Sequence, residues 1–129
     1  MATLSSVNLF VRDLEGLVAF YAELLALPER IDVRSPIYRS LDAGGTAIGF
    51  NGYEAYSLLN LDNERATAGV KSLLTFEVAD RAAVTRLADE AVGRGATIVK
   101  APYDTAYGSR QSVLRDPEGN VFRINAFAP

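Results

Sequence analysis

Leu9-Phe10-Val11-Arg12-Asp13 and Phe76-Glu77-Val78-Ala79-Asp80 are the two stretches that decide the fold of this 129-residue chain. In each stretch apolar residues alternate as in a β-strand, and the stretch ends at an aspartate, a residue that favours a helix N-cap. After each aspartate, apolar residues recur at the spacing of one helix face. The two strand–helix units lie about half a chain apart, which indicates an internal repeat.

Three shorter strands are expected after each helix. Turn sequences separate them, notably Gly44-Gly45 in the first half and Asp116-Pro117-Glu118-Gly119-Asn120 in the second. The strands are expected at about 31–34, 38–41 and 46–51, and again at 97–101, 110–115 and 121–126. The order βαβββ therefore occurs twice, with module one at about 1–55, a connection at about 56–70 and module two at about 71–129. We expect one soluble α+β domain over residues 1–129.

Amino-acid composition and charge limit the classes of ligand and the location that we expect. The chain is 49% hydrophobic and 22% charged, which is typical of a globular domain. Its net charge is −3 and its 13 basic residues are scattered, so no nucleic-acid surface is indicated and a cationic or neutral ligand suits it better. No apolar run is long enough to span a bilayer, and the N-terminal residues do not form a secretion signal, so a cytoplasmic location is expected.

Cysteine and histidine are both absent. Their absence excludes thiolate nucleophiles, cysteine–histidine zinc sites, Ser-His-Asp triads and imidazole acid–base chemistry.

Several ordered motifs give the chain a resemblance to the vicinal-oxygen-chelate superfamily, which includes glyoxalases, extradiol dioxygenases and bleomycin-resistance proteins. They are Val7-x-Leu9-x-Val11-x-Asp13-Leu14, Phe20-Tyr21, Leu24-Leu25, Phe76-x-Val78-x-Asp80 and Arg115-Asp116-Pro117-Glu118-Gly119-Asn120-Val121-Phe122. The resemblance implies that the strands of each module form a curved mixed sheet, a half-barrel with one helix outside. The two half-barrels would enclose a cavity or join across a dimer, and a homodimer is expected by analogy.

Strand alternation then separates two faces of each sheet. The face toward the helix should carry Val7, Leu9, Val11, Phe76, Val78, Phe122 and Ile124. The concave face should carry Ser6, Asn8, Phe10, Ala47, Gly49, Asn51, Leu73, Thr75, Glu77, Arg123 and Asn125.

Metal enzymes of the family bind a divalent ion at positions that read Ser6, Gly49, Leu73 and Arg123 in this chain. Leucine and glycine offer no donor side chain, a neutral hydroxyl binds weakly and a guanidinium repels a cation. Glu77 alone supplies too few oxygens for a hard ion. We therefore expect no metal and no cofactor, as in the bleomycin-resistance branch, whose members bind and sequester a drug.

The sequence does not assign a catalytic residue. The two candidates for a catalytic role are Arg123 and Glu77. Arg123 could grip an oxyanion with two hydrogen bonds, or form a structural salt bridge to Glu77. Glu77 could act as a general base if burial raised its pKa, or simply be solvated or paired.

The remaining candidate ligand-binding residues are amides, aromatics and a threonine on the concave face or in the loop before strand 110–115: Asn8, Phe10, Asn51, Thr75, Tyr103, Tyr107, Gln111 and Asn125. Asp104 in that loop would favour a cationic group. Each residue also has an ordinary interpretation, as a surface amide, a packed ring or a solvated turn.

Three functions stay open. The first is a dimeric, metal-independent protein that binds a small, partly aromatic organic molecule. The second is an enzyme on the same scaffold, a metal-free or, less expected, metal-dependent lyase, isomerase or dioxygenase. The third is a structural subunit whose cavity is filled by its own side chains.

Overall fold

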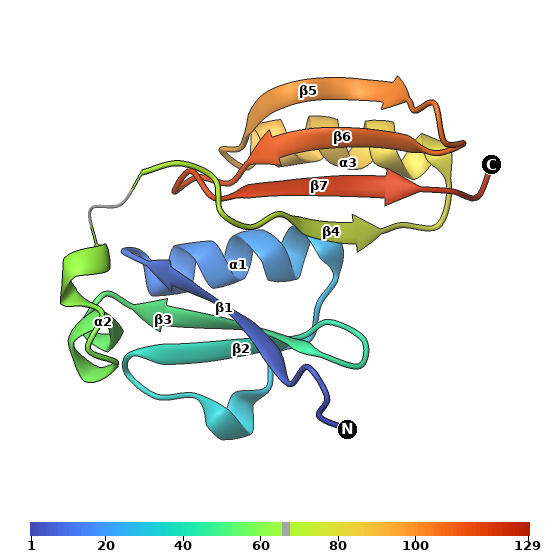
Figure 1. Cartoon of the computed structure of the whole chain (residues 1–129). Coiled ribbons are helices and arrows are strands. Elements are labelled where there is room, and N and C mark those ends of the chain that lie inside the picture. Colours follow the sequence, from blue (N-terminus) through green and yellow to red (C-terminus); the bar gives the residue numbers. More distant parts are fainter. Residues whose placement is uncertain (66–67) are drawn as a thin grey trace. The chain divides into compact units, whose positions relative to one another are not determined.

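The computed structural model describes residues 1–65 and 68–129 and divides into two compact units, Met1–Ala68 (unit one) and Gly69–Pro129 (unit two). Figure 1 shows the elements of both units, and each unit is described below by itself.

Unit one is built on a three-stranded sheet of order β1-β3-β2. Strand β1 (Ser6–Val11) runs parallel to β3 (Ala47–Gly52), and β2 (Tyr38–Asp42) runs antiparallel to β3. Helix α1 (Leu14–Leu25) contacts β2 and β3 and buries an apolar stripe that includes Leu17, Tyr21 and Leu24. A short helix, α2 (Glu54–Leu58), and the 3₁₀ turn η2 (Asp62–Glu64) follow β3.

The strand expected at 31–34 is wrong, because Ile31–Val33 forms the 3₁₀ turn η1. Arg34 folds back so that its Nε lies 2.8 Å from the Oε2 of Glu29. Five residues of extended strand would place these two positions roughly 16 Å apart, so the ion pair and a strand exclude one another. The backbone here pairs only through isolated bridges at Glu29 and Ser35 among the described residues.

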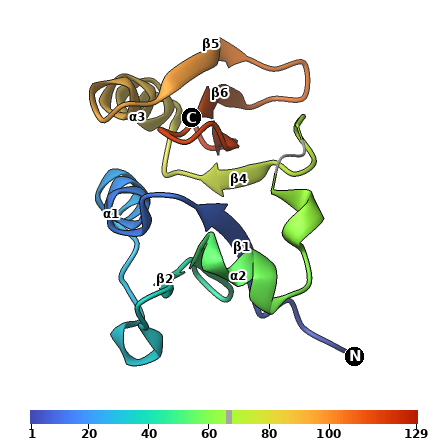
Figure 2. The same cartoon turned by 90° about the vertical axis from the view of Figure 1, so that its left-hand side faces the viewer.

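Unit two has the full βαβββ order and a four-stranded sheet of order β4-β7-β6-β5. Its strands are β4 (Leu74–Glu77), β5 (Thr97–Asp104), β6 (Arg110–Arg115) and β7 (Val121–Ala126). Helix α3 (Arg81–Gly93) lies along one face of this sheet, as Figures 1 and 2 show, and contacts β5, β6 and β7. Leu114, Phe122 and Ile124 are fully buried.

The sequence predictions of an α+β fold with two βαβ-based modules are confirmed. Both aspartates cap their helices: the side chain of Asp13 accepts a hydrogen bond from the Gly16 amide at 3.0 Å, and that of Asp80 from the Ala83 amide at 2.8 Å. The single domain over 1–129 and the module bounds stay predictions, and residues 66 and 67 of the predicted connection lie outside the described residues. Within the described ranges, no helix is both long and apolar enough to cross a membrane.

Candidate functional site

A row of polar residues crosses the sheet of unit two on the face away from α3. Strand register places Tyr103 opposite Gln111, Gln111 opposite Asn125, and Asn125 opposite Glu77, one residue from each of the four strands. Paired residues on neighbouring strands point to the same side of a sheet. The four side chains, all predicted as site residues, therefore form one continuous row.

Hydrogen bonds hold this row in place. Asn125 Nδ2 donates to Glu77 Oε1 at 2.8 Å, and the backbone amide of Phe127 donates to Glu77 Oε2 at 2.8 Å. At the other end, Gln111 Nε2 donates to the hydroxyl of Tyr103. Gln111 Oε1 accepts from the hydroxyl of Tyr107 at 3.0 Å. Both carboxamides and the carboxylate are thus oriented before any ligand arrives.

One atom of the row lacks a partner. The Oδ1 of Asn125 is buried and makes no hydrogen bond with any described residue, although the residue is only 5% exposed. A buried acceptor without a donor costs about 1–3 kcal/mol, so this atom is an unmet hydrogen-bonding requirement of the row.

A second row carries two cations. It lies two residues away from the first row on β4, β6 and β7. Register places Lys100 opposite Val113, Val113 opposite Arg123, and Arg123 opposite Thr75. The Nε of Arg123 donates to Thr75 Oγ1 at 2.7 Å, and the Nζ of Lys100 lies 3.8 Å from the centre of the Tyr103 ring. Arg123 is therefore bound to Thr75, while Glu77 is engaged in the first row.

On the corresponding face of unit one, the polar side chains hydrogen-bond to one another. Asn51 Nδ2 donates to Asn8 Oδ1 at 3.1 Å, and Asn8 Nδ2 donates to Ser6 Oγ at 3.0 Å. The carboxamide of Asn8 occupies the space above Gly49: a β-carbon added there would overlap Asn8 Oδ1 and lie 2.8 Å from the Tyr38 hydroxyl. A larger residue at position 49 would therefore have to displace the Asn8 side chain.

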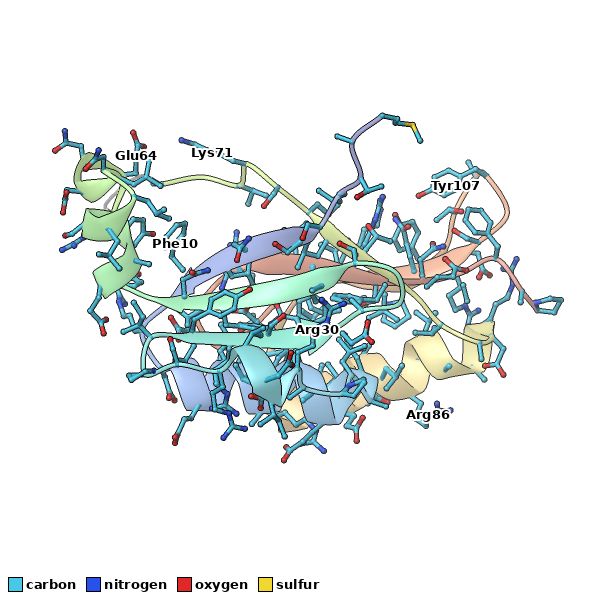
Figure 3. All side chains as sticks on the ribbon, turned by 90° about the horizontal axis from the view of Figure 1, so that it is seen from below. Phe10, Arg30, Glu64, Lys71, Arg86 and Tyr107 are labelled. Carbon is cyan, nitrogen blue, oxygen red and sulfur yellow. The ribbon has the colours of Figure 1, made fainter. Side chains whose placement is uncertain are left out.

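An aromatic group lies at one end of this face. The ring of Phe10 stacks on that of Tyr56 with centroids 4.2 Å apart, and Tyr53 meets Tyr56 edge-on at 5.2 Å. Figure 3 shows Phe10 beside α2, the helix that carries Tyr56. Burial, and secondarily Tyr53, raises the pKa of the Tyr56 hydroxyl despite the nearby guanidiniums of Arg65 and Arg12. Phe10 is thus already stacked on a ring of its own unit.

The helix side of unit one has a hollow of about 380 Å³ at the start of α1, lined in part by Arg12, Arg34 and Arg39. Arg34 and Arg39 both bind Glu29, with Arg39 Nη2 2.6 Å from Glu29 Oε1. These hydrogen bonds lower the pKa of Glu29 to about 2. Arg34 and Arg39 are thus already paired within the chain.

The residues at the family's metal positions do not fit a divalent ion. Ser6 accepts from Asn8, the space at Gly49 is taken by Asn8 and Tyr38, and Arg123 is cationic. Residues 1–65 and 68–129 also bring no three carboxylates together at ion-binding distance.

All ten predicted ligand-binding residues lie on the two sheet faces or in the β5–β6 loop, seven of them on unit two: Thr75, Glu77, Tyr103, Tyr107, Gln111, Arg123 and Asn125. Their role in binding stays a prediction. Asp104 instead pairs with Arg110, whose hydrogen bond lowers the pKa of that carboxyl, and with Arg81. Sequence reasoning missed Lys100, because register shifts on either side of it bring it to the same face as Tyr103.

These features define a class of protein: a tandem βαβ-module α+β domain with polar and aromatic side chains on the sheet faces. The model of the Glyoxalase/Bleomycin resistance protein/Dioxygenase superfamily matches residues 3–124, and the chain belongs to that superfamily.

Solved structures agree with this assignment. The chain is 48% identical to a glyoxalase/bleomycin resistance protein/dioxygenase family enzyme from Burkholderia phytofirmans PsJN, with 98% of this chain and 99% of that chain covered and a TM-score of 0.94. Lactoylglutathione lyase from Agrobacterium tumefaciens has 18% identity, coverage of 98% and 94%, and a TM-score of 0.71. TioX from Micromonospora sp. ML1 has 19% identity, coverage of 98% and 99%, and a TM-score of 0.66. The last two show likeness of fold alone, and no curated protein matches the sequence.

Proposed function

We propose that this protein is a metal-independent, cytoplasmic, homodimeric binding protein that sequesters a small, partly aromatic organic molecule on its sheet face. The observation that carries the proposal is the buried Oδ1 of Asn125, which has no partner among the described residues. It lies in a row of side chains already oriented by hydrogen bonds, and few, well-placed polar groups of this kind fix the orientation of a ligand.

Nearby side chains suit a ligand with flat surfaces. Tyr107 is 60% exposed and its ring lies 6.3 Å from that of Phe127, which is 56% exposed. Figure 3 shows Tyr107 at the end of the β5–β6 loop. Exposed aromatic rings beside a polar row offer stacking area together with hydrogen bonds.

The competing function is a metal-free lyase or isomerase in which Arg123 stabilises an oxyanion and Glu77 or a tyrosine moves a proton. Both carboxylate oxygens of Glu77 already accept hydrogen bonds, from Asn125 Nδ2 and the Phe127 amide. Both oxygens are thus occupied by donors of the chain itself, and these contacts favour binding over proton abstraction.

Native mass spectrometry of the purified protein, with and without chelator and beside denatured spectra, tests the proposal. We expect a metal-free dimer that carries an organic adduct. Asn125→Leu, which keeps the volume and removes the acceptor, should lose the adduct, while the exposed-site control Asn63→Leu should keep it. A stoichiometric metal that the chelator removes would contradict metal independence.

A further inference from the structure

We infer that the face of unit two binds an organic oxyanion, a carboxylate, sulfonate or phosphate on a partly aromatic body, between Lys100 and Arg123. The inference rests on the proposed binding function and adds the charge of the ligand and the place of its anionic group.

The position of the two cations carries the inference. Lys100 on β5 and Arg123 on β7 share one register row and are separated by Val113 on β6. Neighbouring strands lie about 4.8 Å apart, so the two backbones are roughly 10 Å apart across an apolar floor. A single oxyanion above Val113 would lie within reach of both long side chains.

Both cations are held in place by contacts that leave donors available. The Arg123 Nε–Thr75 bond fixes the guanidinium, and no described carboxylate forms an ion pair with it, so its terminal nitrogens can donate to an oxyanion. Lys100 is held over the Tyr103 ring, a contact that uses its charge without consuming its N–H donors.

The carboxylates of this part of the chain do not neutralise the pair. Glu77 lies in the next row and accepts from Asn125 and Phe127. Asp104 is bound to Arg110 and Arg81. Counted together, Glu77, Lys100 and Arg123 carry one net positive charge, although the whole chain carries −3.

The neighbouring row adds a second requirement. Asn125 comes two residues after Arg123 on β7, so its side chain lies about 7 Å further along the same face. Its unpartnered Oδ1 calls for an N–H or O–H donor. The ligand class is therefore an aromatic anion that bears a hydrogen-bond donor about 7 Å from its oxyanion.

A matched pair of fluorescent probes tests the charge. 8-Anilinonaphthalene-1-sulfonate has an aromatic body, an N–H donor and a sulfonate, and N-phenyl-1-naphthylamine has the same body and donor without the anion. Titrations of the full chain would use Lys100→Gln, Arg123→Gln, the double variant and, as a charge-matched control, Arg86→Gln. Arg86 is an exposed residue of α3, the helix on the opposite face of the sheet (Figure 3).

We expect each site variant to raise the Kd of the sulfonate about tenfold, as a charge-assisted hydrogen bond of about 1.4 kcal/mol implies, and the double variant to raise it further. Added salt should weaken sulfonate binding, while the Kd of the uncharged probe should stay unchanged in every variant. Arg86→Gln should behave as the wild type. Circular dichroism of the variants, together with their binding of the uncharged probe, reports whether they stay folded.

Two results would overturn the inference in different ways. Binding of the uncharged probe with no preference for the sulfonate, or equal losses in Arg86→Gln, would refute the anion site and leave the proposed binding function standing. Failure of the wild type to bind either probe would count against the binding function itself and the inference with it.

Discussion

Unit one and unit two share the same strand register but carry different side chains at matching positions. In both, the first strand pairs in parallel with the last, which pairs antiparallel with the strand before it. Where unit one has Gly49 opposite Asn8, unit two has Arg123 opposite Thr75. The small residue leaves room for the Asn8 amide in unit one, whereas the large one gives unit two a cation. One backbone plan thus carries a cluster of neutral amides in unit one and a cationic row in unit two, the face on which we propose that the ligand binds.

The largest expected effects come from the cores. Phe50 in unit one and Ile124 in unit two are both fully buried, each on its unit's last strand and opposite an apolar residue of the first. Phe50→Ala should lower the free energy of unfolding by about 3–5 kcal/mol and Ile124→Ala by about 2–5 kcal/mol. Urea denaturation measures both, and a loss below 1 kcal/mol at either position would contradict that unit's core.

The next largest effect is a pH dependence of the free energy of unfolding, caused by a carboxyl group of unit one. The pKa of Glu29 is lowered from 4.5 to about 2, chiefly by the hydrogen bond from Arg39 and then by that from Arg34. A carboxyl whose pKa is lowered on folding stabilises the protein fully above its unfolded pKa and less as pH falls toward the folded value. We expect the wild type to lose about 2 kcal/mol relative to Glu29→Gln between about pH 4.5 and 2.

Unit two supplies the control for that experiment. The pKa of Asp104 is also lowered, by Arg110 and then Arg81, but its side chain is 59% exposed, and exposed ion pairs contribute little. Asp104→Asn should therefore leave the acid profile of stability nearly unchanged. Parallel profiles for the wild type and Glu29→Gln would refute the role given to Glu29.

The helix caps should behave alike in both units. Asp13→Ala and Asp80→Ala each remove a side chain that accepts from a backbone amide in the first helical turn. Each should cost about 1 kcal/mol of unfolding free energy, and the Asn variants should restore most of it, because asparagine caps nearly as well. Unchanged stability in an alanine variant would show that its cap adds nothing.

The smallest effect on stability tests whether the Asn8 amide occupies the space above Gly49. Gly49→Ala should push Asn8 off its position and lose its bond to Asn51, at about 1 kcal/mol. In an Asn8→Ala background the same change should cost less, since only the Tyr38 hydroxyl remains in the way. Equal costs in the two backgrounds would show that Asn8 does not occupy that space.

Local signals allowed much of the fold to be predicted. Alternation placed Leu9 and Val11 in the core of unit one, and the aspartate before each apolar stripe located the helix starts. The error at 31–34 has a tertiary cause, the bonds of Glu29 to Arg34 and Arg39, which short-range patterning does not reveal.

The site was harder to predict than the fold. Alternation gave the face on which Glu77, Arg123 and Asn125 lie, but the rows that join them depend on register between strands far apart in the sequence. The irregular pairing of β5 turns Lys100 to the side of Tyr103, although a spacing of three would separate them in a regular strand. The bond between Glu77 and the Phe127 amide likewise joins distant parts of the chain.

The most direct test of the claim that unit two, rather than unit one, presents the binding face is a ¹H–¹⁵N spectrum of the side-chain amides during addition of 8-anilinonaphthalene-1-sulfonate. We predict that the signals of Gln111 and Asn125 shift together along one saturating curve while those of Asn8 and Asn51 stay in place. Saturating shifts of Asn8 and Asn51, with Gln111 and Asn125 unmoved, would contradict the account.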